Sequence, residues 1–260
     1  MPRRPKTPEQ IEYEQRYRQM HLDLMKLFRT TPENQLTDED LLAVALSYSM
    51  RKCDYRQAAK DLLNSYGSLK NLLNACTDEL LNEGPLRLNT VLMLKGIPAL
   101  CQHAEIEQIP KRLRINKPQN AEVYLKPHFI GYNYEKAYLL LLNDYYYPKK
   151  LILIGEGSGS RVYIDPQKIT RDTVVNRCNK IVLAHSHIGQ NPNPSLDDKL
   201  TTLEVARLLS GLGIQVLDHL IFAENICYYL SNNEEMDCSI LAFSKREPKT
   251  IREKLQYPKK

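Results

Sequence analysis

Two histidines separated by one residue, His185 and His187, are the side chains of this chain best suited to chemistry. They end an apolar, β-prone run that begins at Lys180. Side chains at positions i and i+2 of a strand point to the same face, so the two imidazoles can converge on one point. A loop rich in Pro and Asn follows, and Ser195 and Asp198 then stand where the pattern indicates a helix start.

These residue types suit a catalytic zinc ion, because two neutral imidazoles and one carboxylate leave the fourth position of a tetrahedral zinc open for water. We therefore predict a zinc site formed by His185, His187 and Asp198. Two other interpretations stay open at this point. The histidine pair could pack inside a buried strand. Ser195 and Asp198, ahead of an apolar run, also match a helix capping box, which needs no metal.

The order and spacing of these residues resemble the JAMM motif of the JAB/MPN metalloprotease domain: H-S-H, seven residues, serine, two residues, aspartate. The likeness to the RadC branch of that superfamily extends over residues 185–229 and the upstream segment 157–166, and covers most of residues 115–232. It implies an α/β fold of the JAB/MPN, cytidine-deaminase-like type, a mixed sheet flanked by helices. It also implies one Zn²⁺ per chain and hydrolysis of a peptide or isopeptide bond in a peptide or protein substrate that the sequence does not identify.

The same resemblance implies further roles around the metal. The motif serine matches Ser195, whose expected role is to hydrogen-bond the oxyanion of the transition state. The family also carries a glutamate as general base, expected four or five residues ahead of the glycine that matches Gly157. Ile152 and Leu153 stand there and cannot accept a proton, so Glu156 is the nearest candidate base.

One further histidine, His219, lies in the segment 217–220. It is either a residue behind the metal ligands, with its ring oriented by a carboxylate, or a histidine that packs in the sheet.

The first part of the chain, residues 1–108, is predicted to form an all-α domain, because apolar residues recur there at helical spacing. Segments 40–46 and 65–73 resemble the RadC N-terminal region, and this implies a DNA-binding helix-hairpin-helix at residues 82–88. That stretch has one glycine, beside a proline without an N–H donor and a glutamate, so its residues favour a structural hairpin.

The remainder is predicted to consist of a Pro-bounded linker, a JAB/MPN domain and a tail, at residues 109–118, 119–235 and 236–260. Expected strands are 136–143, 150–154, 161–164, 180–184, 214–217, 220–222 and 225–230. Expected helices are 120–125, 166–179 and 196–212.

Composition places the chain among ordinary globular proteins, with 42% hydrophobic and 26% charged residues. No stretch approaches the roughly 18 apolar residues of a membrane span, so no membrane partner is expected. Six scattered cysteines and no visible signal peptide favour a reducing, cytoplasmic setting. The last 17 residues carry seven Lys or Arg and two Glu, and thereby the whole formal charge of +5.

Three classes of function follow from these observations. The first is a zinc metallohydrolase. The second is a catalytically silent MPN binding module that lacks the general base. The third is a DNA-associated protein, for repair or as an accessory of mobile elements, supported by the N-terminal resemblance and the basic tail.

Overall fold

The computed structural model describes residues 6–50, 53–82, 86–132, 134–157, 163–189, 191–224, 226–234 and 238–244. The chain divides into two compact units, Met1–Cys101 and Gln102–Lys260. The predicted hairpin residues 83–85 and the basic stretch 245–260 lie outside the described residues. DNA binding, which depends on both, stays a prediction.

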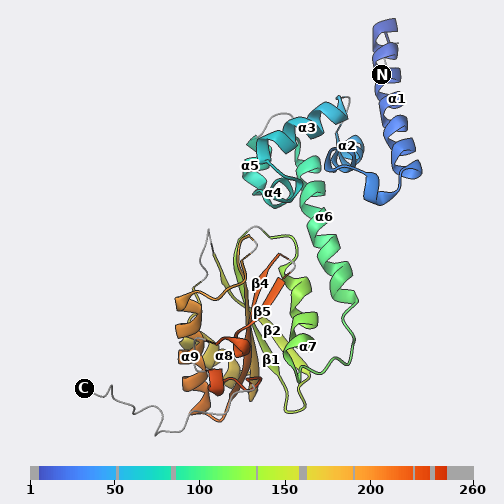
Figure 1. Ribbon diagram of the computed structural model, residues 1–260. Helices are drawn as coiled ribbons and strands as arrows, with labels where there is room; N and C mark the ends of the chain where they lie inside the picture. The colour runs from blue at the N-terminus through green and yellow to red at the C-terminus, as the bar shows by residue number, and fades with distance from the viewer. Residues whose placement is uncertain are drawn as a thin grey trace. The chain divides into compact units, whose positions relative to one another are not determined.

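The first unit is helical throughout its described part, as predicted (Figure 1). Its elements are α1 (Pro8–Thr30), η1 (Glu33–Gln35), α2 (Asp38–Ser49), α3 (Tyr55–Tyr66), α4 (Leu69–Asn74), α5 (Thr77–Asn82) and α6 (Leu88–Glu107), the last of which continues into the second unit. Local caps explain where helices begin: Thr37 forms a capping box with Asp40 at α2, and Ser68 caps α4. Their buried apolar side chains, such as Leu46, Leu72 and Leu94, form one core.

The second unit is a mixed sheet between helices, which confirms the predicted α/β fold. Its strands are β1 (Lys136–Leu142), β2 (Pro148–Glu156), β3 (Lys180–Ser186), β4 (Gln215–Ala223) and β5 (Ile226–Tyr229). The sheet order is β2-β1-β3-β4-β5, with β3 and β4 parallel and every other neighbouring pair antiparallel. The helical elements are α7 (Pro118–Leu125), η2 (Lys126–Phe129), α8 (Pro166–Val175), α9 (Leu196–Ser210), η3 (Leu230–Asn232) and η4 (Cys238–Ile240).

The two faces of this sheet bury different side chains. Leu139 of β1 and Leu183 of β3 pack with α8 and α9 on one face. Leu140 and Val182, which alternate with them, pack with α7 on the other face. Figure 1 shows α8 and α9 on the opposite side of the sheet from α7. A helix–sheet–helix sandwich of this kind buries both faces of its central strands.

Three segments differ from their predicted form. The strands expected at 214–217 and 220–222 are one continuous strand, β4. Tyr163 and Ile164 belong to no strand, and the other half of the strand expected at 161–164 is not described. The predicted linker is partly packed, because Ile115 is fully buried and its N–H donates to Tyr146 O at 2.7 Å.

The start of the expected tail also packs within the second unit. Cys238 and Leu241 are buried in its core, and the N–H groups of Ala242 and Phe243 donate to backbone oxygens of β4. Among the described residues, no helix is both long and apolar enough to cross a bilayer.

Candidate metal centre

The strand β3 delivers both histidines to one face of the sheet. His185 lies at the end of β3 and is 1% exposed, while His187 follows the strand directly. The His187 N–H donates to Phe222 O at 2.7 Å, so the backbone stays extended beside β4. Because Leu183 points toward α8 and α9, the i+2 spacing sends the two imidazoles to that face as well.

The helix α9 delivers the carboxylate through its own N-terminal cap. Ser195 is the N-cap residue and Asp198 stands three positions later. Asp198 Oδ2 accepts hydrogen bonds from Ser195 N (2.8 Å) and Ser195 Oγ (2.6 Å), and Ser195 Oγ accepts from Asp198 N (3.1 Å). The capping box is therefore present, and it is the device that holds the carboxylate beside the histidines. The cap and the ligand interpretations are compatible rather than exclusive.

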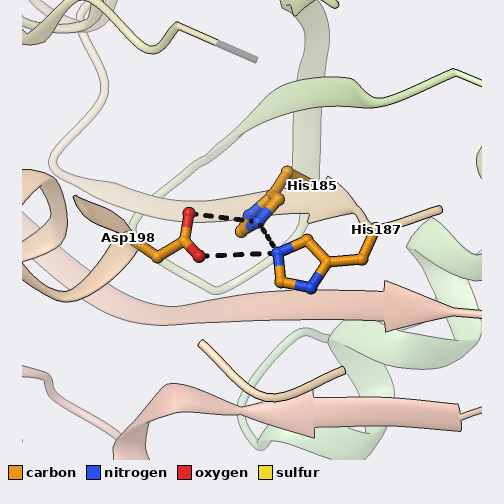
Figure 2. A group of neighbouring side chains, drawn as sticks. All are labelled: His185, His187 and Asp198. Carbon is orange, nitrogen blue, oxygen red and sulfur yellow. Dashed lines mark hydrogen bonds and ion pairs between the residues drawn. The ribbon is translucent and has the colours of Figure 1, made fainter. Parts of the chain in front are cut away.

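The three side chains converge on one point (Figure 2). His185 Nε2 lies 2.9 Å from His187 Nε2 and 3.2 Å from Asp198 Oδ1, and His187 Nε2 lies 3.4 Å from Asp198 Oδ2. Two ligand atoms of a tetrahedral zinc, each bound at its usual distance, lie about 3.3–3.5 Å apart. The donor set therefore fits a zinc ion in chemistry and nearly in size.

The nitrogens that face away from this point are already occupied. His187 Nδ1 lies 3.0 Å from Asn191 O, and a carbonyl can only accept, so Nδ1 carries the proton of the neutral ring and Nε2 has a lone pair. Nε2 carries a proton only when the ring is doubly protonated. His185 Nδ1 lies 2.8 Å from His219 Nε2, so its Nε2 is the atom that faces the site. Two imidazole nitrogens and a carboxylate this close repel one another unless a metal ion or a proton lies between them.

Burial and charge set the protonation of the group. Burial, together with the neighbouring His219, holds the pKa of His185 well below its usual range. Burial tends to raise the pKa of Asp198, but the hydrogen bonds from a protonated His187 and from the Ser195 hydroxyl lower it overall. The hydrogen bond to Asp198 raises the pKa of His187. The carboxylate is thus ionised, and a proton on His187 competes with a metal ion.

Comparison with known proteins agrees with this geometry. Residues 115–236 match the family model described as a RadC-like JAB domain. This chain carries a RadC-like JAB domain. The UPF0758 protein of Photorhabdus laumondii is 29% identical over 195 residues, which are 74% of this chain and 84% of that protein. The UPF0758 protein of Pasteurella multocida is 25% identical over 194 residues, which are 75% of this chain and 86% of that protein.

The structure does not bring the candidate base Glu156 together with the three ligands. Its carboxylate pairs with Lys136 Nζ at 3.2 Å, and these two residues face each other in the β1–β2 register. Residues directly opposite in an antiparallel pair share a face, and the next residue along points to the other face. Ala137 shares its face with His185, so Lys136 and Glu156 lie on the opposite face of the RadC-like domain's sheet.

Another glutamate of the RadC-like domain, Glu135, lies on the histidine side. It directly precedes β1 and is 6% exposed. Ala137 faces His185 in the antiparallel β1–β3 register, and that register, continued by two residues, sets Glu135 opposite His187. The bond from Gly157 N to Glu135 O (2.8 Å) keeps the backbone extended there. Glu135 also raises the pKa of His187, after the larger effects of Asp198 and Asn191.

Sequence reasoning missed Glu135 because its signal is not local. Within the sequence it is only a glutamate ahead of an apolar run. Its position opposite His187 depends on the pairing of β1 with β3. These strands are far apart in the sequence, since the bond from Lys136 N to Ser186 Oγ joins residues 50 positions apart. The candidate expected from the sequence, Glu156, lies on β2, whereas Glu135 lies directly ahead of β1.

The contacts of Ser195 and His219 in the RadC-like domain bear on the roles that were predicted for them. The Ser195 hydroxyl donates to Asp198 Oδ2, so its role toward an oxyanion stays a prediction. His219 is fully buried and contacts His185, as a residue behind the ligands would. Its ring is oriented by the Thr202 hydroxyl, 2.6 Å from Nδ1, rather than by a carboxylate. Burial lowers the pKa of His219 to about 4.

Proposed function

We propose that this chain is a zinc-dependent hydrolase of a peptide or isopeptide bond. The observation that carries the proposal is the convergence of His185, His187 and Asp198, whose ligand atoms all lie within 4.8 Å of one another, on the sheet face that also carries Glu135. The RadC-like JAB domain supports it, because that fold suits a metal-dependent family.

The ligands would be His185 Nε2, His187 Nε2 and a carboxylate oxygen of Asp198. Zinc held by three protein ligands lowers the pKa of a bound water toward neutrality and polarises a substrate carbonyl. Asp198 Oδ2 is occupied by the Ser195 N–H and hydroxyl, which leaves Oδ1 as the freer carboxylate atom. Imidazole and carboxylate ligands without thiolates are typical of catalytic rather than structural zinc.

Glu135 is the proton carrier of the proposed reaction. Its carboxylate takes a proton from the water that attacks the carbonyl carbon, and the new C–O bond forms. The same carboxylate then returns the proton to the leaving nitrogen as the C–N bond breaks. Its burial and its position opposite His187 suit this task, because a general base has to be within reach of the reacting water.

The first test replaces, one at a time, Glu135, which directly precedes β1, and Glu156, which ends β2. Glu135→Gln should lower the rate of peptide or isopeptide cleavage by about 10²–10⁴-fold, the usual contribution of a general base. Zinc content should not change, since Glu135 is not among the proposed ligands. The matched control, Glu156→Gln, should leave the rate close to that of the wild type, because Glu156 lies on the other face and is half exposed. Cleavage is followed on a library of linear and isopeptide-linked peptides.

Two results would count against the proposal. Loss of activity in Glu156→Gln with full activity in Glu135→Gln would reverse the assignment of the base. Zinc binding by the wild type without cleavage of any library member would favour the second class of function, a binding module without catalysis.

A further inference from the structure

A line of buried hydrogen bonds connects the backbone of α9 to the ring of His185. Thr202 Oγ1 lies 2.6 Å from Asp198 O, His219 Nδ1 lies 2.6 Å from Thr202 Oγ1, and His185 Nδ1 lies 2.8 Å from His219 Nε2. Thr202, His219 and His185 are each at most 1% exposed, so no water competes for these bonds. The line begins at the carbonyl of Asp198 and returns to its carboxylate, 3.2 Å from His185 Nε2.

The first atom of the line sets the direction of every bond in it. A carbonyl oxygen only accepts, so the Thr202 hydroxyl donates its one proton to Asp198 O. The same hydroxyl oxygen can then only accept from His219, which puts the proton of a neutral His219 on Nδ1. His219 Nε2 is left with a lone pair and accepts from His185 Nδ1–H. His185 Nε2, which faces the site, consequently has no proton.

We infer that Thr202 and His219 are positioning residues that set the tautomer of His185 and thereby keep its Nε2 free to bind a metal ion. The inference rests on the proposed function in one respect, namely that the site takes zinc. The opposite tautomer would place a proton on His185 Nε2, between the histidines. It would also turn the Thr202 hydroxyl toward His219 and break its bond to Asp198 O.

Simple packing does not account for this arrangement. A histidine that only filled space in the sheet would need partners for its nitrogens, but the direction of those bonds would not matter. Here both nitrogens of His219 contact groups that belong to the site or to the ligand-bearing helix. Partners behind a metal-bound histidine fix its tautomer and orientation, and their loss lowers metal affinity about 10–100-fold.

The test compares Thr202→Val with Thr202→Ser in the full chain. Valine keeps the shape of threonine and removes the hydroxyl, whereas serine keeps the hydroxyl. In the metal-free protein, ¹⁵N spectra of the histidine rings should show His185 protonated on Nδ1 in the wild type and in Thr202→Ser, and a mixture of tautomers in Thr202→Val. Zinc affinity, measured by competition with a chromophoric chelator, should fall about 10-fold in Thr202→Val and stay near the wild-type value in Thr202→Ser.

A second pair keeps the inference testable if Thr202→Val does not fold. His219→Gln retains an amide that can accept from His185 Nδ1–H and donate to Thr202, so it should keep the tautomer. His219→Leu removes both contacts and should release it. An unchanged His185 tautomer in Thr202→Val or His219→Leu, or a wild-type His185 protonated on Nε2, would overturn the inference. Failure of the wild type to bind zinc would contradict the proposed function instead, since the metal-free spectra decide the tautomer.

Discussion

At the scale of single residues, each proposed ligand side chain has one nitrogen or oxygen atom that contacts a neighbouring residue. His187 Nδ1 contacts Asn191 O, His185 Nδ1 contacts His219, and Asp198 Oδ2 contacts Ser195. Each side chain is therefore held in orientation before any metal binds, and the loss of conformational freedom on binding is small.

Asp218 is a buried acid beside these residues, and its protonation should affect stability. It is fully buried, and burial raises its pKa to about 6, against the hydrogen bonds from Ser231 and from the His219 N–H that lower it. Between pH 3.8 and about 6 the folded protein therefore holds a proton that the unfolded chain has lost. The stability from this group is fully present below pH 3.8 and is lost as the pH rises through about 6, by about 3 kcal/mol in total.

The substitution Asp218→Asn removes this titration and keeps the shape of the side chain. The difference in unfolding free energy between Asp218→Asn and the wild type should shift in favour of the variant by about 3 kcal/mol between pH 4 and pH 7. Denaturant unfolding of the metal-free proteins at both pH values measures it. Because the comparison is a difference, other titrating groups, including His219, cancel. A difference that does not change with pH would show that Asp218 is ionised throughout.

At the scale of elements, the capping box of α9 joins helix formation to the proposed metal site. The Ser195 hydroxyl both accepts from the helix N-terminus and donates to Asp198, so one residue serves the helix and the ligand. A capping box at α2, formed by Thr37 and Asp40, makes the same bonds in the first unit.

These two caps allow a matched comparison. Ser195→Ala and Thr37→Ala should each lower the free energy of unfolding by about 0.5–2 kcal/mol through the loss of the cap. Ser195→Ala alone should also weaken zinc binding, by about 10-fold, because Asp198 loses a hydrogen bond that orients it. Calorimetric titration with zinc alongside thermal unfolding separates the two effects. Equal zinc affinities in the two variants would mean that the cap is purely structural.

Sequence patterns predicted the elements that are determined by neighbouring residues along the chain. The strand that carries the histidines and the helix that starts at Leu196 follow from an apolar run and a cap, and both were predicted nearly to the residue. The sequence predicted two strands in place of β4 because Asp218 and His219 interrupt its apolar pattern. Both are accommodated within one strand because Ser231, Thr202 and His185 satisfy their polar atoms.

The remaining parts of the site depend on contacts that no local pattern encodes. Glu135 comes opposite His187 only through the β1–β3 register, and His219 contacts His185 only through the pairing of β3 with β4. Leu183, two residues before His185, faces His219 in that second pairing. The sequence thus contained the proposed ligands in order, whereas the proposed base and positioning residues required the folded sheet.

At the scale of the whole molecule, every residue of the proposed site lies in the second unit, Gln102–Lys260. His185, His187 and Asp198 are, within the described part of the chain, the one group of three or more histidine, cysteine or acidic side chains placed to share a metal ion. The six cysteines are free thiols at scattered positions. A single zinc ion per chain, bound without sulfur, is the stoichiometry that this distribution predicts.

Zinc X-ray absorption on the full chain, loaded with one equivalent of zinc, decides directly whether these three residues hold the metal. We expect only nitrogen and oxygen ligands at about 2.0–2.2 Å, with the scattering pattern of two imidazoles, and loss of that pattern in His187→Ala. A sulfur ligand at about 2.3 Å, or an unchanged spectrum in His187→Ala, would contradict this expectation, because the metal would then be bound elsewhere in the chain.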